Sequence, residues 1–246
     1  MNTLFIGHNL IVLESVSSTN DFCIQSLEQE LPEGTVVYAK QQTAGKGQRG
    51  KKWHSNNGDS LTFSIVFYPE NDVSDQFVIN KAISVALCES LKGLGLNAKI
   101  KWPNDIYVNN RKLSGILIEN SLRGAKIQYC IVGVGINVNQ LKFNSALPNP
   151  ISIRNLLGVK IDINTLLADL CYNIERRYLQ FRAGFFSKIN TDYNNLLYRK
   201  GEEHQFLIAG RLVKGQVEGV DQLGKIKLLT IEGEEAYANG EIEFII

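Results

Sequence analysis

Residues Gly45–Trp53, GKGQRGKKW, combine glycines with a cluster of basic side chains. Gly45, Gly50 and Lys51 match part of the phosphate-loop spacing, but Lys52 stands where a Ser or Thr would hold magnesium. Glycines let the backbone approach a ligand closely, and the basic side chains favour an anion. The pattern is equally typical of a solvated basic hairpin loop, so both interpretations stay open on these residues alone.

The residues that follow decide how this loop is built. Gly45, Gly47 and Gly50 also match the glycine spacing of a dinucleotide-binding fingerprint. The phosphate loop and this fingerprint both need a helix that begins at the last glycine. Here the next residues are HSNNGDS, which predict a turn, and then SLTFSIVFY, whose apolar side chains alternate as in a strand. Because TVVYAK before the loop is also strand-like, we expect the loop to join two strands.

A second group of chemically capable side chains lies in Lys101–Asn120, KWPNDIYVNNRKLSGILIEN. Asn109 and Asn110 tolerate the positive φ of a tight hairpin. Around that hairpin and the Pro103 turn stand four polar or charged residues: Lys101, Asn104, Asp105 and Lys112. An ordinary hairpin with surface lysines fits the same spacing, and Asp105 alone could form an Asx turn at the Pro103 bend.

A third stretch, VGVGINVN, predicts a strand with Gly133 and Gly135 on one face, followed by Asn137. Bare backbone on one face lets another group approach closely, although a crowded, bulged strand has the same pattern.

The elements that would position these residues indicate an α+β fold. A helix from about Ser74 has apolar residues at four-residue steps and ends in the GLG at Gly93, and another helix is expected over Ile163–Phe181. From Gly201, regularly spaced glycines separate short alternating runs, which is typical of a small β-barrel. We therefore expect a domain over residues 1–197 and a small β domain over 198–246.

Composition limits the class of protein. The 246 residues are 44% apolar, enough for a buried core, and the formal charge of +1 gives no field that would attract nucleic acid. The four cysteines have no paired spacing, so buried free thiols are expected rather than a zinc site. Without a signal peptide or a membrane-length apolar run, the sequence predicts a cytoplasmic protein with no membrane partner.

Four stretches, SSTN, QTAGKGQRGKKW, KWPNDIYVNNRKLSGILIE and VGVGIN, together resemble the motifs of the biotin protein ligases, and the likeness spans residues ~10–246. The resemblance implies a mixed-sheet catalytic domain of the biotin/lipoate ligase type with a small C-terminal SH3-like β-barrel. It also implies an enzyme that forms biotinyl-AMP from biotin and ATP, with Mg²⁺, and then acylates one lysine of a biotin carboxyl carrier protein.

Residue roles follow from the same resemblance, position by position. The catalytic residues would be Lys112, which bridges the biotin carboxylate and the α-phosphate, with Lys46 and Arg49. Biotin would contact Ser18, Thr19, Gln42, Gly45, Gly47, Trp53, Gly115 and Ile116. ATP would contact Lys46, Gln48, Arg49, Lys101, Asn104, Asp105, Lys112, Gly135 and Asn137, and Asp105 would help to hold Mg²⁺.

The sequence departs from the family pattern at two loop positions. Lys46 and Gln48 stand where many relatives carry arginine, which predicts looser retention of the acyl-adenylate. Only sixteen residues precede Ser17, too few for the winged-helix domain of regulatory relatives, so a DNA-binding repressor is not expected. A homodimer is possible by analogy with relatives, and the segment FNSALPNPISIRNLLG matches too weakly to assign roles.

Two other functions remain as alternatives. A lipoate or octanoate ligase resembles this family in fold, but it would show a double-arginine, triple-glycine stretch that is absent from GKGQRGKKWHS. A biotin- or nucleotide-binding sensor without catalysis would normally lack the central lysine, and Lys112 is present.

Overall fold

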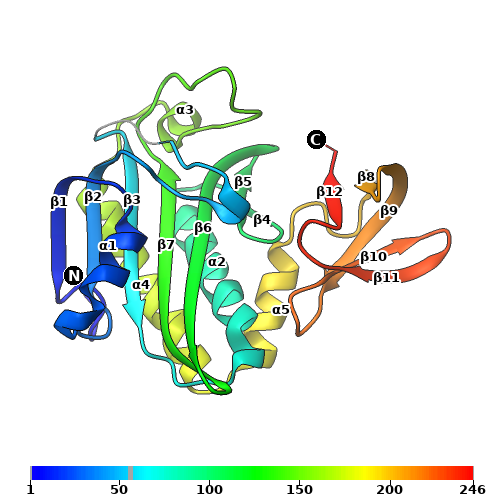
Figure 1. Cartoon of the computed structure of the whole chain (residues 1–246). Coiled ribbons are helices and arrows are strands. Elements are labelled where there is room, and N and C mark those ends of the chain that lie inside the picture. The colour runs from blue at the N-terminus through cyan, green and yellow to red at the C-terminus, as the bar shows by residue number, and fades with distance from the viewer. Residues whose placement is uncertain (1, 55–57, 246) are drawn as a thin grey trace.

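The structure is a computed structural model that describes residues 2–54 and 58–245. Its centre is a seven-stranded sheet (Figure 1), whose strands in spatial order are β1 (Leu10–Val16), β2 (Val36–Gln42), β3 (Ser60–Phe67), β7 (Lys126–Asn137), β6 (Arg111–Arg123), β5 (Asp105–Val108) and β4 (Lys99–Lys101). β1 and β2 are parallel and the other neighbours are antiparallel. The expected mixed-sheet α+β class is therefore confirmed.

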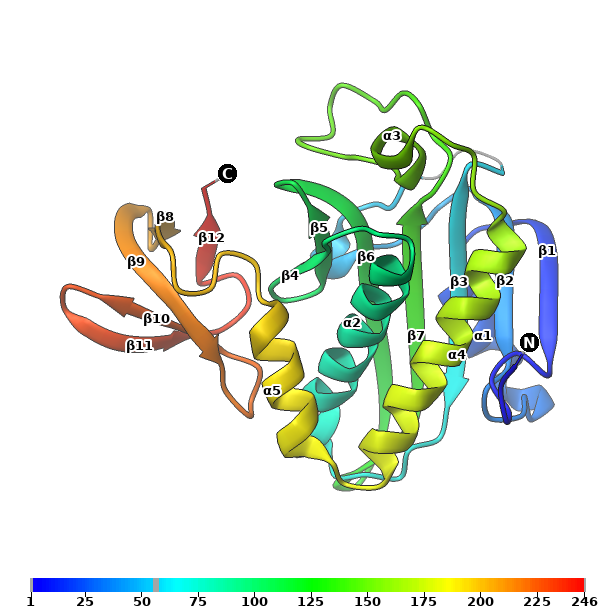
Figure 2. The same ribbon diagram turned by 180° about the vertical axis from the view of Figure 1, so that it is seen from behind.

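Helices cover the two faces of this sheet unequally. Figure 2 shows one face covered by α2 (Gln76–Gly93) and α4 (Ile163–Arg182), with α5 (Phe186–Leu196) beside α2, while α1 (Thr19–Ser26) lies on the opposite face. The short helix α3 (Ile153–Leu157) lies beyond one end of the sheet, and 3₁₀ turns span η1 (Leu27–Gln29), η2 (Gln48–Gly50) and η3 (Val73–Asp75). The sparsely covered face is the one that carries the start of α1 and the glycine-rich loop.

The two long helices form where the apolar periodicity predicts them. In α2, Ile79, Ile83, Leu87 and Leu91 are all fully buried, because their four-residue steps put them on the face against the sheet. In α4, Asp162 caps the first turn by accepting from the N–H of Thr165 at 2.7 Å. Buried residues of both helices form one core with the large sheet, and this core supports the strands that carry the polar motifs.

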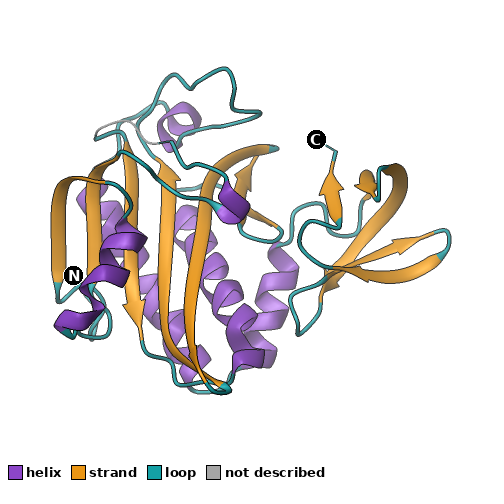
Figure 3. Ribbon diagram, viewed as in Figure 1, coloured by secondary structure: helices purple, strands orange, loops and turns teal. Residues whose placement is uncertain are grey.

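A second sheet is built from the C-terminal residues, and α5 lies between it and the large sheet (Figures 1 and 3). It is antiparallel throughout, in the order β11 (Gly233–Tyr237), β10 (Ile226–Thr230), β9 (Arg211–Val220), β8 (Glu203–Ile208) and β12 (Ile242–Phe244). Trp102 donates from Nε1 to the carbonyl of Gly224 at 2.9 Å, and Lys81 donates to the carbonyls of Val220 and Asp221. These buried contacts fix the small sheet against α2 and the β4–β5 turn.

The loop between β2 and β3 is as expected in outline. Only the three-residue turn η2 interrupts it, Lys46 and Lys52 pair as an isolated β-bridge, and no nucleotide-binding helix follows its last glycine among the described residues. The predicted turn HSNNGDS lies partly outside the described residues, since these omit 55–57. The hairpin prediction is confirmed, with φ of 49° at Asn109 and 61° at Asn110.

Candidate functional site

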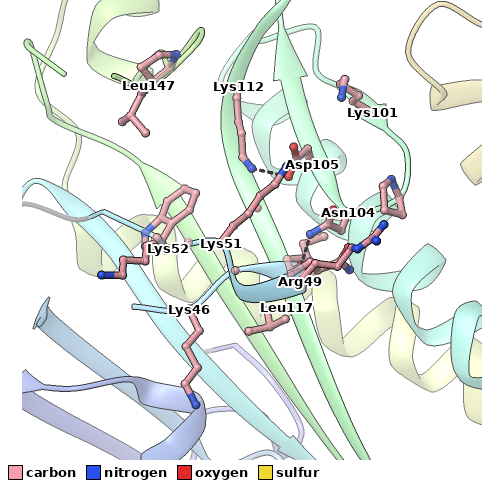
Figure 4. A pocket seen from close by; sticks show the side chains of 18 of the residues that line it. Lys46, Arg49, Lys51, Lys52, Lys101, Asn104, Asp105, Lys112, Leu117 and Leu147 are labelled. Carbon is pink, nitrogen blue, oxygen red and sulfur yellow. Dashed lines mark hydrogen bonds and ion pairs between the residues drawn. The ribbon is translucent and has the colours of Figure 1, made fainter. Parts of the chain in front are cut away.

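A cavity of about 1090 Å³ opens on the sparsely covered face of the large sheet (Figure 4). Its walls come from the start of α1, the loop after β2, the β4–β5 turn, the first half of β6, the last part of β7, residues 147–150, and the C-terminal residues 239, 240 and 242–245. The cavity therefore gathers segments that are far apart in sequence, and both sheets contribute to it.

All but one of the residues assigned from the resemblance line this cavity: Ser18, Thr19, Gln42, Lys46, Gly47, Gln48, Arg49, Trp53, Lys101, Asn104, Asp105, Lys112, Gly115, Ile116, Gly135 and Asn137. The exception is Gly45, which does not line the cavity but helps to fold the loop. Its carbonyl accepts from the N–H of Trp53 at 2.9 Å, and a Cβ there would lie 2.6 Å from the carbonyl oxygen of Trp53. Its absence of a side chain is thus needed for the loop to close on itself.

One end of the cavity is polar and built at the N-terminus of α1. Ser18 caps that helix, with Oγ accepting from the N–H of Asp21 at 3.4 Å. The next residue, Thr19, donates from its backbone N–H to Oε1 of Gln42 at 2.7 Å, and its Oγ1 lies 3.1 Å from the same oxygen. Capping and lining are compatible, because the turn that caps the helix also faces the cavity.

The middle of the cavity is an aromatic wall made possible by glycines. The indole of Trp53 occupies the space that a Cβ of Gly135 would fill, and its ring edge lies 3.4 Å from the corresponding position at Gly115. Both glycines sit on paired strands, where Gly115 is opposite Gly135. The bare strand face predicted from VGVGIN is therefore a surface against which the Trp53 indole packs.

The basic end of the cavity centres on Lys112. Its Nζ lies 2.6 Å from Oδ1 of Asp105 and 5.9 Å from the centroid of the Trp53 ring (Figure 4). Lys101 lies nearby, with its Nζ 4.9 Å from the ring centroid of Phe244, and burial lowers the pKa of Lys101. The structure thus places Asp105 in an ion pair with Lys112, so that a carboxylate partly neutralises the Lys112 ammonium.

The glycine-rich loop does not direct all of its cations at Lys112. The ammonium of Lys46 pairs with Asp21 at 2.5 Å and points away from Lys112 in Figure 4; this hydrogen bond raises the pKa of Lys46. Arg49 donates from Nη1 to the carbonyl of Asn239 at 3.1 Å, while Gln48 accepts from Nδ2 of Asn239 at 3.1 Å. The loop is therefore tied to α1 on one side and to the C-terminal sheet on the other.

Two asparagines of the site form hydrogen bonds that hold neighbouring backbone segments together. Asn104 donates to the carbonyl of Ile116 at 2.7 Å and accepts from its N–H through the backbone carbonyl at 2.9 Å. Asn137 donates to the carbonyl of Ile151 at 3.1 Å and lies 3.5 Å from that of Lys112. These bonds hold the β4–β5 turn and the end of β7 against β6, which carries Lys112.

Sequence reasoning missed several residues that line the cavity, among them Asn20, Tyr107, Leu117, residues 147–150 and the C-terminal residues 239, 240 and 242–245. Asn20 stands in the SSTN motif, so a signal for it existed. The C-terminal residues carry no local signal, because only the packing of the second sheet brings them to the cavity.

Other expectations concern metals, thiols and membranes. The four cysteines are free and buried, as expected, and burial raises the pKa of each thiol. Within residues 2–54 and 58–245, no group of three His, Cys, Asp or Glu side chains is placed to hold a metal ion. In the same part of the chain, no helix is both long and apolar enough to cross a membrane.

Comparison with known proteins tests the resemblance. The model of the biotin/lipoate A/B protein ligase family matches residues 12–137. The chain is 29% identical over 247 residues to the bifunctional ligase/repressor BirA of Bacillus spizizenii, covering 99% of this chain and 76% of that protein. It is 27% identical over 240 residues to the biotin–[acetyl-CoA-carboxylase] ligase of Paracoccus denitrificans, covering 95% of this chain and 99% of that protein.

Comparison of the fold with solved structures supports the same resemblance. The structure of the biotin protein ligase from Aquifex aeolicus in complex with biotin and ATP matches with a TM-score of 0.81 at 27% identity, over 97% of this chain and 99% of that chain. The motif resemblance and the expected fold class are therefore confirmed. With its family model spanning half of the sequence and these relatives covering nearly all of it, the chain belongs to the biotin/lipoate A/B protein ligase family.

Proposed function

We propose that this chain is an ATP-dependent biotin protein ligase that makes biotinyl-AMP and transfers biotin to a lysine of a biotin carboxyl carrier protein. Residues 1–197 form the biotin- and ATP-binding domain and residues 198–246 a small C-terminal domain. The observation that carries the proposal is one cavity with a polar end at Thr19 and Gln42, an aromatic wall at Trp53, and a basic end at Lys112. This order suits a polar heterocycle, an apolar acyl chain and a carboxylate joined to phosphate.

In the first step, a carboxylate oxygen of biotin attacks the α-phosphorus of ATP, and the bond to pyrophosphate breaks. Two anionic groups must approach each other, so a cation between them lowers their repulsion and stabilises the charge of the transition state. Lys112 is placed for this role, because its ammonium lies beside the aromatic wall at the basic end. Lys46 and Arg49 reach the same ligand only if the loop after β2 moves.

Magnesium would enter with ATP rather than occupy a site made by protein alone. Mg²⁺ typically uses one or two carboxylates together with phosphates and water. Asp105 lines the cavity and fits that requirement, since its carboxylate faces the basic end where the phosphates would lie. In this assignment Lys112 releases Asp105 when it turns to the α-phosphate.

In the second step, the amine of an acceptor lysine attacks the acyl carbon of biotinyl-AMP, an amide bond forms, and AMP leaves. The acceptor must present an exposed lysine at the mouth of the cavity, as a small carrier domain of a biotin-dependent carboxylase would. Incubation with biotin, ATP and such a domain should add one biotin to it, as detected by mass spectrometry. Replacement of the acceptor lysine by arginine should abolish the addition.

The first step can be tested before any acceptor is known, by exchange of labelled pyrophosphate into ATP. We expect exchange with biotin and none with lipoate or octanoate. Lys112→Ala should lower the exchange rate at saturating substrates by about 100-fold, which is typical of the loss of one group that stabilises the transition state. Lys142→Ala, at an exposed lysine outside the cavity, should match the wild type. Tight biotin binding without exchange would instead identify a non-catalytic sensor.

A further inference from the structure

A chain of polar side chains, buried except for the partly buried Glu119, lies at the polar end of the cavity, and the proposed reaction does not use it. Asn20 is 3% exposed and fits over Gly133, because its amide occupies the space that a Cβ of Gly133 would fill. Ser64 is fully buried on β3 and touches both Thr19 and Asn20. Glu119 on β6 completes the chain at the far side of Asn20.

The hydrogen-bond directions in this chain begin at Glu119. A carboxylate only accepts, and it lies 2.7 Å from Nδ2 of Asn20. The backbone carbonyl of Leu117, a second obligate acceptor, lies 3.3 Å from the same nitrogen. Both amide hydrogens of Asn20 are therefore committed, and its Oδ1 must face Ser64, whose Oγ is 2.5 Å away.

The same reasoning fixes the next two hydroxyl groups. Oδ1 of Asn20 can only accept, so the single hydroxyl hydrogen of Ser64 goes to Asn20. The contact of 2.7 Å between Oγ of Ser64 and Oγ1 of Thr19 then requires the hydrogen of Thr19, for which Oε1 of Gln42 at 3.1 Å is the other internal acceptor. In either case Thr19 has no hydrogen left for a ligand, so at this lining residue of the cavity the hydroxyl oxygen can only accept.

We propose that Asn20, Ser64 and Glu119 are positioning residues that make the Thr19 hydroxyl an acceptor for a ring N–H of biotin. The proposal rests on the proposed function, since it names the group of that substrate which this wall selects. A donor at this place matters because a buried acceptor that meets another acceptor loses its hydrogen bond and stays desolvated. The three residues thus set substrate selectivity without touching the reacting atoms.

The first experiment perturbs Asn20 and uses a matched buried asparagine as control. Asn20→Asp removes the amide donors and places a second carboxylate beside Glu119, so we expect the Kd for biotin to rise about tenfold or more, measured by calorimetry without ATP. Asn173 also donates to a carboxylate, that of Asp169, but far from the cavity. Asn173→Asp should lower the melting temperature and leave the Kd for biotin within about twofold.

The KM for ATP separates a positioning role from general damage. It should be unchanged in Asn20→Asp, because the basic end of the cavity does not contact this chain. An unchanged Kd for biotin in Asn20→Asp, or an equal loss in Asn173→Asp, would overturn the proposal.

The second experiment tests directly whether the Thr19 hydroxyl accepts or donates a hydrogen bond to the ligand. It does not require the Asn20→Asp variant to fold. The probes are biotin and its two cyclic carbamate analogues, in each of which oxygen replaces one ring N–H. The wild type should bind at least one analogue roughly 10- to 100-fold more weakly than biotin. Ser64→Ala removes the nearer of the two internal acceptors of the Thr19 hydrogen and leaves only Oε1 of Gln42 at 3.1 Å, which already accepts from the Thr19 N–H at 2.7 Å. The Thr19 hydroxyl can then turn from this longer contact and donate to the ring oxygen, so the discrimination should fall below about threefold.

The outcomes distinguish an error in the role of this hydrogen-bonded chain from an error in the proposed function. Wild-type discrimination retained in Ser64→Ala, or no discrimination in a wild type that binds biotin, would overturn the role of this chain. A wild type that binds no biotin would instead overturn the proposed function.

Discussion

At the scale of single residues, the ion pair between Lys112 and Asp105 allows two different roles for the Asp105 carboxylate. The 2.6 Å contact is compatible with a carboxylate that only balances the lysine charge and with one that also serves Mg²⁺. We predict that Asp105→Asn raises the Mg²⁺ concentration for half-maximal pyrophosphate exchange about tenfold, because one of few anionic ligands is lost. The measurement is an exchange titration with MgCl₂ at fixed ATP.

A matched control removes a carboxylate from an ion pair outside the cavity. Asp72 pairs with Lys126 at 2.9 Å on the surface, so Asp72→Asn should leave the Mg²⁺ dependence unchanged. A slower Asp105→Asn enzyme with the wild-type Mg²⁺ optimum would limit Asp105 to the positioning of Lys112.

Motifs predict which residues meet at the site better than they predict how those residues are held. Lys112, Trp53 and Gly135 lie in contiguous stretches whose residue types carry the signal, and they do line one cavity. The partners of Asn20 are Ser64 and Glu119, which are 44 and 99 residues away in sequence. Their hydroxyl and carboxylate look ordinary in a strand, so only the sheet order of β3, β7 and β6 reveals the chain.

At the scale of elements, the loop after β2 is fastened to the C-terminal sheet by Asn239, which contacts both Gln48 and Arg49. Gln48 contributes a neutral hydrogen bond where an arginine would add charge near the phosphate of the adenylate. We predict that Gln48→Arg lengthens the half-life of enzyme-bound biotinyl-AMP about fivefold, an effect of about 1 kcal/mol for one partly exposed charge. Release would be followed by rapid filtration.

The control for this prediction adds the same charge elsewhere. Gln222 is exposed in the turn between β9 and β10 and does not line the cavity, so Gln222→Arg should leave the half-life as in the wild type. An unchanged half-life in Gln48→Arg would mean that the glutamine does not loosen retention.

Elements with a strong period were predicted well, and those without one were not. α2 and α4 follow from apolar steps that bury one helix face, and the hairpin follows from Asn109–Asn110. α5 has no run of comparable length and was missed, since only Ile189 and Tyr193 are buried along it. Its place is set by packing between the two sheets, which is tertiary information that a local pattern does not hold.

At the scale of the whole molecule, we expect burial of titratable groups to set the alkaline limit of stability. Burial raises the pKa of Cys23, Cys88 and Cys171 from 9.0 to about 12, and it raises that of Cys130 as well. A raised folded-state pKa means that the stabilisation is complete below pH 9 and is lost as the pH rises from 9 towards 12. Each thiol therefore contributes a loss of about 1.4 kcal/mol per pH unit in this window.

Two buried lysines, Lys101 and Lys81, act in the opposite direction, because burial lowers the pKa of both, and the shift is large for Lys81. Burial lowers the pKa of Lys81 from 10.5 to about 8, although Asp221 nearby favours the charged form. The unfolded chain then binds more protons than the folded one between pH 8 and 10.5, so this lysine alone makes stability rise with pH by about 2 kcal/mol from pH 8 to 10. The four thiols outweigh these lysines, and the buried tyrosines, whose pKa is also raised, reinforce the thiols above pH 10.

We therefore predict that the free energy of unfolding in urea is several kcal/mol lower at pH 10 than at pH 8. Cys23→Ala costs stability at pH 8 through the cavity it leaves, but between pH 8 and pH 10 it should lose about 1 kcal/mol less than the wild type does. Lys81→Met should lose about 2 kcal/mol more over the same interval, because the opposing titration is gone. Equal losses in all three proteins would show that neither group remains buried and shifted in solution, and that the alkaline limit has another origin.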